Sequence, residues 1–195
     1  MRKWIGAFCV SLGVICLLGA VGFVVYNHRE ADRATAFSQS LLEEVQRQID
    51  QQNVQPDDAV KEMPTVLVDG YESIGILSVP VLDLELPVLT DWSYNKLKKA
   101  PCLYYGSYYE KDFVVAAHNF RSHFGRLSEL QLGDAVVFTD VTGQKHYYEV
   151  VLVETLPAAA TEEMITSGFD LSLYTCTTGG GSRVTVRCNR VQGNS

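Results

Sequence analysis

The sequence predicts an all-β domain, a barrel or a sandwich, that follows an N-terminal membrane helix. From about residue 65 onward the chain consists of short β-branched and aromatic runs separated by turn residues, which is typical of all-β folds. Residues 4–26, in contrast, are 23 consecutive residues without a charge. A chain of 195 residues has room for one such domain and this appendage, but not for a second full domain.

The uncharged stretch predicts a transmembrane anchor, because it can span a hydrocarbon core of roughly 30 Å as a helix. A cleaved secretory signal is the alternative, but its apolar region usually covers only about 7–15 residues. Arg2 and Lys3 favour a cytoplasmic N-terminus, although Arg29 and Arg33 on the far side weaken this bias. We therefore expect residues 1–26 to be a cytoplasmic tip and signal anchor that crosses the cell membrane once, with the rest of the chain extracellular.

The charge of the chain argues against two classes of partner. The net charge is −7, and the first 33 residues contribute +2 from four basic and two acidic residues, which leaves −9 for the remainder. An acidic domain repels phosphate groups, so nucleic acid and anionic lipid headgroups are not expected partners of the extracellular part.

A linker or stalk is expected over residues 27–64. Within it an apolar residue recurs every fourth position among polar ones: Phe37, Leu41, Val45 and Ile49. This spacing predicts an amphipathic helix that packs one stripe on the domain, and a solvated spacer is the open alternative. Pro56 and Pro64 indicate a loop, so the folded domain is expected to occupy residues 65–195.

Seven strands can be assigned within the domain from their composition and bounding turn residues. They are residues 73–82, 84–91, 112–119, 133–140, 146–156, 171–176 and 183–189. The fourth and fifth form a hairpin across Gly143. Helical signals are limited to a turn or two in residues 93–100, 122–130 and 155–170, so a β fold with only short helices is expected.

The cysteines point to a thiol with a specific role. Cys9 and Cys16 lie in the apolar span and are interpreted as small hydrophobic residues there. Cys102, Cys176 and Cys188 remain, an odd number, so at least one extracellular thiol is unpaired. Core filling is the interpretation for Cys102, with a disulfide to Cys188 as an alternative.

The strand pattern singles out Cys176. In the strand 171–176, Ser172, Tyr174 and Cys176 share one face. The glycine-rich connection that follows is suited to a hairpin, and its closure places Cys176 opposite Arg183 and Ser172 opposite Arg187.

Distance separates the two arginines. Arg187 is four residues further along its strand, roughly 13 Å away at about 3.3 Å per residue. Arg183 is therefore the guanidinium that can act at the thiolate or at a developing oxyanion. Cys188 points to the opposite face and is interpreted as a core residue, while Arg187 and Arg190 are interpreted as scaffold or surface.

Nucleophilic catalysis by a cysteine also calls for a histidine or arginine, because a thiol with a pKa near 8.5 is only about 3% ionised at pH 7. His118 ends a buried run and begins a loop, a position where active sites are often built. His123 is its rival in the same loop. His28 beside the anchor and His146 among tyrosines are interpreted as surface or core residues.

These residues resemble a known family, the sortases, which are membrane-anchored cysteine transpeptidases of Gram-positive bacteria. The family signature is a TLxTC strand followed by an arginine that opens the next strand, with a histidine far upstream. Here "LSLYTC" carries it, with Ser172 where the family usually has threonine. The runs "SIGILSVPVLDLELPVL", "AAHNF" and "HFGRLSELQLGD" are also similar to family segments. The resemblance covers residues 74–191.

The resemblance implies a sortase-type closed β-barrel of about eight strands and a catalytic triad of His118, Cys176 and Arg183. Cys176 is expected to attack the threonine carbonyl of an LPxTG-like sorting signal, giving a thioester acyl-enzyme, and His118 to protonate the leaving amine. An amine from a cell-wall precursor or another protein then resolves the thioester. Arg183 is expected to hold the substrate and the oxyanion, with support from Thr175.

The resemblance also implies partners and leaves the subclass open. Surface proteins with a C-terminal sorting signal and an amine acceptor are the expected partners. The short segment 155–170 cannot hold the long helix of class B enzymes, which favours a class A- or D-like architecture, whereas "AHN" has a class B character. Glu162 and Glu163 are interpreted as acids in the first turn of a helix rather than calcium ligands, so no metal and no cofactor is expected.

Two other functions remain open on the residues alone. A membrane-anchored β-domain could bind envelope proteins without catalysis, with Cys176 as a buried thiol and Arg183 as a surface charge. A cysteine peptidase could use the same groups to hydrolyse its substrate, because transfer and hydrolysis differ only in whether an amine or water reaches the thioester.

Overall fold

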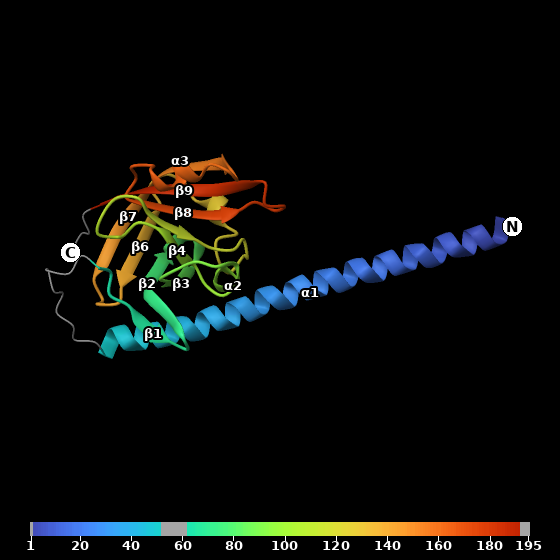
Figure 1. The fold of residues 1–195 in the computed structure, drawn as a ribbon, viewed down its shortest axis with the longest axis horizontal. Coiled ribbons are helices and arrows are strands. Elements are labelled where there is room, and N and C mark those ends of the chain that lie inside the picture. The colour runs from blue at the N-terminus through green and yellow to red at the C-terminus, as the bar shows by residue number, and fades with distance from the viewer. Residues whose placement is uncertain (1, 52–61, 192–195) are drawn as a thin grey trace. The chain divides into compact units, whose positions relative to one another are not determined.

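The computed structural model describes residues 2–51 and 62–191 of the chain (Figure 1). Contacts divide the chain into two units, Met1–Arg33 and Ala34–Ser195. Helix α1 (Arg2–Gln51) supplies all described residues of the first unit and opens the second. The loop expected at Pro56 lies outside the described residues, and the expected boundaries at residues 26 and 64 stay predictions.

The N-terminal part of α1 is a candidate membrane span. By length and composition, one helix among the described residues is apolar enough to cross a bilayer, with a mean hydropathy of 1.7 over its most apolar window. Its large side chains between Leu12 and Tyr26 are exposed to solvent in the structure, as expected of a surface that faces lipid.

The second unit is a closed β-barrel with one added strand. Its strands are β1 (Val66–Val68), β2 (Tyr71–Val79), β3 (Leu84–Leu89), β4 (Cys102–Tyr105), β5 (Phe113–Ala116), β6 (Ala135–Asp140), β7 (Lys145–Pro157), β8 (Leu171–Cys176) and β9 (Ser182–Arg190). They follow the order β1-β2-β3-β4-β5-β8-β9-β7-β6, and β6 pairs again with β2. Eight strands therefore close the barrel, which confirms the predicted fold, and β1 extends β2 outside the ring.

The helices of the barrel unit are short apart from α1. They are the 3-10 turns η1 (Pro80–Leu82) and η2 (Leu127–Glu129), and the helices α2 (Tyr94–Leu97) and α3 (Thr161–Ile165). α2, η2 and α3 lie within segments where the sequence allowed only a turn or two of helix. The strand expected over residues 73–82 was wrong at its end, because β2 stops at Val79 and Pro80, which has no N–H for a strand ladder, begins η1. In Figure 1, α3 lies beside β9 at the top of the barrel.

Closure of the barrel depends on Gly75. Gly75 pairs with Asp140 where β2 meets β6, and its φ is +150°. A Cβ atom there would lie 2.2 Å from the carbonyl oxygen of Thr139. Only glycine permits this close approach of two backbones.

Two apolar clusters hold the unit together. The larger fills the barrel and includes Phe113, Phe138 and Leu173. The second lies between α1 and the outside of the barrel, where buried Leu41, Val45 and Ile49 pack with residues such as Val66, Ile76 and Cys102, and Phe37 packs against it. The predicted amphipathic stripe is thus confirmed, and the solvated spacer is ruled out for this segment.

The C-terminal hairpin has the register that strand parity predicted. Cys176 pairs with Arg183, Tyr174 with Thr185, and Ser172 with Arg187. Strands β1 and β4 were not assigned from the sequence. They have only three and four residues, so neither shows enough alternation to identify a strand.

Candidate active site

Strand β5 delivers His118 to the same end of the barrel as Cys176. Strands β5 and β8 run parallel, with Ala116 beside Tyr174 as the last pair of their register. Two residues further along each strand come His118 and Cys176. The N–H of Ala117 donates to the carbonyl of Tyr174 at 3.2 Å, which continues the pairing toward these two residues. His118 and Cys176 are both half-buried.

Arg183 completes a row across three strands. It pairs directly with Cys176 in the β8–β9 hairpin, and it is also half-buried. Its Nη1 donates to the carbonyl oxygens of Gly180 and Ser182, both at 3.1 Å. Two carbonyl groups at the turn of the hairpin thus hold the guanidinium.

Thr175 ties the strand of Cys176 to the segment before His118. Its hydroxyl donates to the carbonyl of Ala117 at 2.9 Å, and its side chain is buried. The expected support of an oxyanion by Thr175 stays a prediction, because in this structure the hydroxyl of Thr175 donates its hydrogen bond to the carbonyl of Ala117.

The two histidines of the loop differ in environment. His123 is fully buried, and within the described part of the chain neither ring nitrogen has a hydrogen-bond partner. Burial, with a contribution from His118, lowers the pKa of His123 to about 4. The ring of Phe120 contacts both imidazoles, at centroid distances of 4.3 Å to His118 and 5.7 Å to His123. His123 therefore has the properties of a core residue, and His118 is the histidine that reaches the surface.

The other cysteines and His146 lie in the scaffold. Cys102 and Cys188 are buried free thiols, and burial raises the pKa of each to about 12, so both stay protonated. This confirms Cys188 as a core residue and Cys102 as a core filler. His146 is buried as well, with Nε2 3.1 Å from Oδ2 of Asp140.

A groove opens at the thiol of Cys176 and is called here the cysteine groove. Its lining includes Cys176 and Arg183 from the hairpin, Trp92 and Tyr104 from around α2 and β4, and Thr161 and Met164 from α3. A second hollow, lined by Asn119, Ser128 and Thr178 among others, also reaches Cys176. Half-buried Cys176 therefore lines two hollows.

One wall of the cysteine groove is aromatic. Ring centroids are 5.6 Å apart between Trp92 and Tyr104 and 5.2 Å apart between Tyr104 and Tyr174. Tyr94 continues the row beside Trp92 at 5.9 Å and is 80% exposed. Sequence reasoning missed this wall. The density of aromatic residues between 92 and 105 was the available signal. No strand was assigned there from the sequence, so the direction of these side chains could not be predicted.

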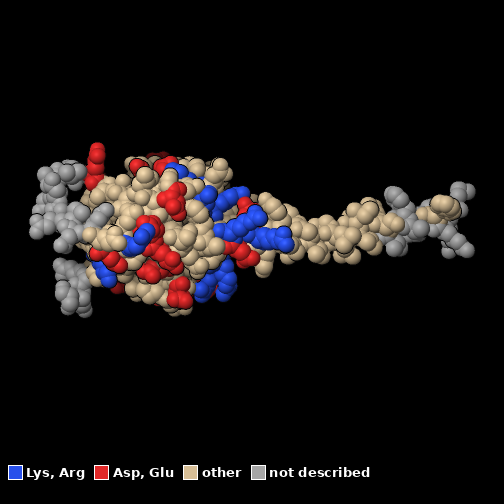
Figure 2. Space-filling model, turned by 90° about the horizontal axis from the view of Figure 1, so that it is seen from below, with Lys and Arg blue, Asp and Glu red and all other residues tan. Residues whose placement is uncertain are grey.

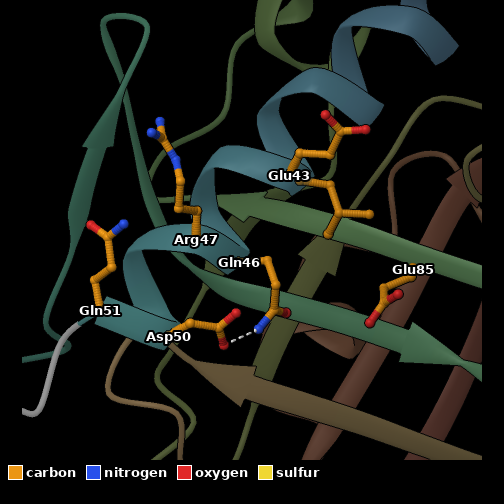
Figure 3. Close-up of a pocket in the computed structure, with 7 residues that line it drawn as sticks. Glu43, Gln46, Arg47, Asp50, Gln51 and Glu85 are labelled. Atoms are coloured by element: carbon orange, nitrogen blue, oxygen red, sulfur yellow. Dashed lines mark hydrogen bonds between the residues drawn. The ribbon is translucent and has the colours of Figure 1, made fainter.

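A larger hollow of about 440 Å³, against about 120 Å³ for the cysteine groove, lies between α1 and β3 (Figure 3). Its lining consists of Leu42, Glu43, Gln46, Arg47, Asp50, Gln51 and Glu85. Figure 3 shows Gln46 hydrogen-bonded to Asp50, at 2.8 Å. None of these side chains is an activated nucleophile, so chemistry rather than size places the candidate site at Cys176.

The surface charge follows the acidic composition. Figure 2 shows acidic side chains spread over the visible face of the barrel unit and most of the basic ones toward one end of it. Among the residues that the structure describes, no group of three or more His, Cys, Asp or Glu side chains is arranged to hold a metal ion. Glu162 and Glu163 lie in the first turn of α3.

The comparison with protein families decides the classification. The family model of the sortase domain matches residues 77–191, more than half of the chain and the whole segment that carries His118, Cys176 and Arg183. The chain belongs to the sortase family. It is thus a cysteine transpeptidase of the sortase type with the closed barrel of that family.

Solved structures agree with the sortase fold. A sortase D5 transpeptidase of Clostridium perfringens superposes with a TM-score of 0.63 at 16% identity, covering 80% of this chain and 99% of that one. Sortase C of Streptococcus pneumoniae gives 0.56 at 23% identity, with 85% and 96% covered. Sortase A of Corynebacterium diphtheriae gives 0.57 at 16% identity, with 89% and 97% covered. No curated protein matches this sortase in sequence.

Proposed function

We propose that this sortase cleaves an LPxTG-like sorting signal and transfers the protein that bears it to an amine. Cys176 is the nucleophile, His118 is the general acid and base, and Arg183 is the cation that stabilises the oxyanion and binds the substrate. The proposal rests on the alignment of Cys176 and Arg183 on paired strands with His118, which follows the end of the adjacent strand β5. Cys176 pairs with Arg183, and the parallel register of β5 and β8 leads to His118 beside Cys176.

The first half of the reaction forms a thioester. The thiolate sulfur of Cys176 attacks the carbonyl carbon of the threonine residue, and the carbonyl oxygen takes up the negative charge. The guanidinium of Arg183 stabilises that oxyanion. When the C–N bond breaks, protonated His118 gives its proton to the departing amine, which leaves an acyl group on sulfur and a neutral imidazole.

The second half reverses these roles with a new amine. The amine nitrogen attacks the thioester carbonyl, neutral His118 accepts the proton that the amine loses, and the C–S bond breaks to restore the thiolate. The products are a new amide and the starting enzyme, so no oxidant or external cofactor is needed. Surface proteins with a C-terminal sorting signal are the proposed donors, and a cell-wall precursor or another protein is the proposed amine.

The location of the enzyme is part of the proposal. The apolar part of α1 would act as a signal anchor with the N-terminus in the cytoplasm, which places the barrel outside the cell. Support comes from Arg2 and Lys3 before the apolar stretch and from its length. Protease added to intact cells is expected to remove the barrel and leave the anchor.

A peptide assay tests the chemistry. The full-length protein in detergent is incubated with a fluorogenic LPxTG-type peptide, with and without an amine acceptor, beside Cys176→Ala. We expect cleavage that depends on Cys176 and an amide product when the amine is present. Cleavage without transfer would support a peptidase, and absence of cleavage would support a non-catalytic envelope-binding domain.

A further inference from the structure

The segment that connects β7 to β8 forms one side of the cysteine groove. Thr161 and Met164 of α3 line the groove together with Cys176. Helix α3 has only five residues. A helix of this length has little stability of its own in water, so its position must come from contacts with the barrel.

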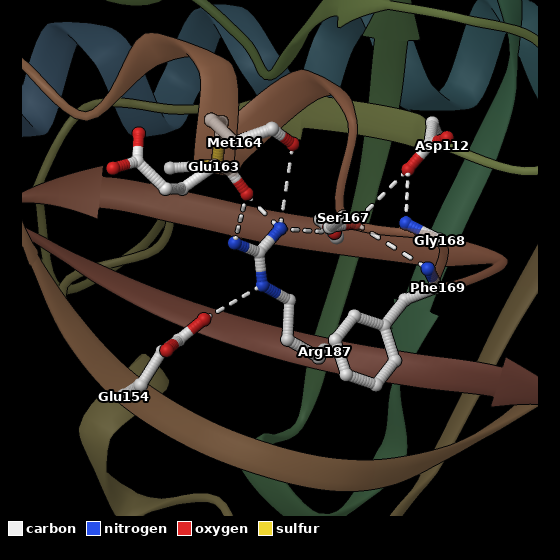
Figure 4. A network of polar contacts seen from close by, with 9 residues as sticks. Asp112, Glu154, Glu163, Met164, Ser167, Gly168, Phe169 and Arg187 are labelled. Atoms are coloured by element: carbon white, nitrogen blue, oxygen red, sulfur yellow. Dashed lines mark hydrogen bonds and ion pairs between the residues drawn. The ribbon is translucent and has the colours of Figure 1, made fainter.

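Arg187 supplies contacts of this kind from within β9 (Figure 4). Its Nη2 donates to the carbonyl of Glu163 at 2.7 Å, and its Nη1 to the carbonyl of Met164 at 3.4 Å. The sulfur of Met164 lies 4.0 Å from Nη1. One guanidinium thus bonds to two successive carbonyl groups of α3 and contacts the side chain that lines the groove.

The guanidinium is itself fixed by two further side chains. Nη1 donates to the hydroxyl of Ser172 on β8 at 2.8 Å, and Nε donates to Glu154 on β7 at 2.8 Å. Figure 4 shows Glu154 on one side of the guanidinium and the carbonyl groups of Glu163 and Met164 on the other. The planar fork of arginine suits such multiple acceptors, which the point charge of lysine cannot satisfy together.

Burial makes this arrangement rigid. The side chain of Arg187 is only 2% exposed, while that of Glu154 is 29% exposed. A buried guanidinium that lost its partners would carry a large desolvation penalty, so breaking these hydrogen bonds is strongly unfavourable. Moving α3 away from the barrel would strip two carbonyl acceptors from this charge.

The same connection is tied at its other end by a separate contact. Oδ1 of Asp112 accepts hydrogen bonds from the hydroxyl of Ser167 at 3.0 Å and from the N–H of Gly168 at 2.8 Å. Neither Ser167 nor Gly168 lines the cysteine groove. Of these two contacts, that of Arg187 reaches a residue that lines the groove, Met164, and that of Asp112 does not.

We propose that Arg187 is a positioning residue for the acyl donor: it fixes α3 so that Thr161 and Met164 form a ready-made wall of the cysteine groove. This rests on the proposed function in that the groove is taken to hold the sorting signal. Arg187 touches no reacting group, and its effect reaches the substrate through α3. It sets the affinity for the sorting signal rather than the rate of the chemical steps.

The test compares both ties in the full-length protein in detergent. Arg187→Met removes the charged fork, and Ser172→Ala removes one acceptor without a charge. Asp112→Ala releases the far end of the connection, and Arg47→Met removes an arginine from the exposed face of α1. Amide hydrogen exchange is measured over α3 and over β5 and β8, and KM and kcat are measured with the LPxTG-type peptide.

We expect Arg187→Met to speed amide exchange in α3 at least tenfold while β5 and β8 stay protected. KM should rise about tenfold with kcat changed less than threefold, the pattern expected when binding is lost equally from the ground state and the transition state. Ser172→Ala should shift both readouts in the same direction by less, and Asp112→Ala and Arg47→Met should leave KM within twofold.

Three results would overturn it. One is unchanged exchange in α3 in the Arg187 variant, another is a fall in kcat without a rise in KM, and the third is an equal rise in KM for Asp112→Ala. If Arg187→Met does not fold, the amide exchange of α3 and the KM of Ser172→Ala test the role of Arg187 instead. The exchange measurement needs no substrate, so it judges the tie to α3 even if the peptide is not cleaved and the proposed function fails.

Discussion

The hydroxyl of Thr175 donates a hydrogen bond of 2.9 Å to the carbonyl of Ala117. Each partner is the immediate neighbour in sequence of a proposed catalytic residue, Cys176 or His118. The bond therefore fixes the end of β8 against the end of β5 at the point where the thiol and the imidazole leave their strands.

Removing this bond should misplace the histidine without unfolding the barrel. Thr175→Val keeps the shape and loses the donor, so we expect kcat/KM to fall about tenfold and the free energy of unfolding to fall by about 1 kcal/mol. Thr185→Val is a matched control, because the hydroxyl of Thr185 is buried without a hydrogen-bond partner in the described part of the chain. Equal losses in both variants would argue against a special role for the Thr175 bond.

Arg183 should act on the chemical step. Loss of a single oxyanion donor typically lowers kcat by about 10²–10³-fold, and we expect Arg183→Ala to show a loss of two orders of magnitude or more. Because Arg183 is half-buried at the groove, the melting temperature should change little. Steady-state kinetics and thermal unfolding check this, and a variant that keeps its kcat would remove Arg183 from the mechanism.

Substitution of the two histidines of the loop, His118 and His123, should affect activity very differently. His118→Ala should lower kcat by about 10²–10⁴-fold, the usual contribution of a general acid and base. His123→Leu replaces a buried, neutral imidazole with an apolar side chain and should keep activity within a few-fold. The reverse order in a peptide assay would assign the catalytic role to His123.

His123 should also make stability depend on pH. Burial lowers its pKa to about 4 in the folded chain from an ordinary 6.5. Between these values the unfolded state binds more protons, so folding stability should be complete above about pH 6.5 and decline as the pH falls toward 4, by about 3 kcal/mol in all.

Denaturant unfolding at pH 7, 6 and 5 measures this decline. His123→Leu should flatten the pH dependence over that range, whereas substitution of the exposed His28 by glutamine should leave it unchanged. An unaltered slope in His123→Leu would show that the buried imidazole is not its source.

Some of the site could be predicted because strand geometry is regular. Side chains alternate with a period of two, so the sequence alone placed Cys176 opposite Arg183 and Ser172 opposite Arg187, as the structure has them. The apolar stripe on α1 was equally regular and was also found.

Other features depend on contacts between distant segments. The burial of Arg187 requires acceptors from β7, α3 and β8. No local sequence pattern predicts that a charged residue will form hydrogen bonds with all three. The sequence therefore allowed scaffold or surface for Arg187, and the structure selects scaffold. The aromatic wall at Trp92 and Tyr104 likewise arises from two segments that meet only in the folded barrel.

Mass spectrometry of the trapped acyl-enzyme identifies the nucleophile of this sortase. The full-length protein is mixed with an LPxTG-type peptide without an amine, quenched in acid and digested. We expect the acyl fragment of the peptide to be attached to Cys176, an added amine to remove it as an amide, and Cys176→Ala to carry no adduct. An adduct on another residue, or peptide turnover by Cys176→Ala, would show that Cys176 is not the nucleophile.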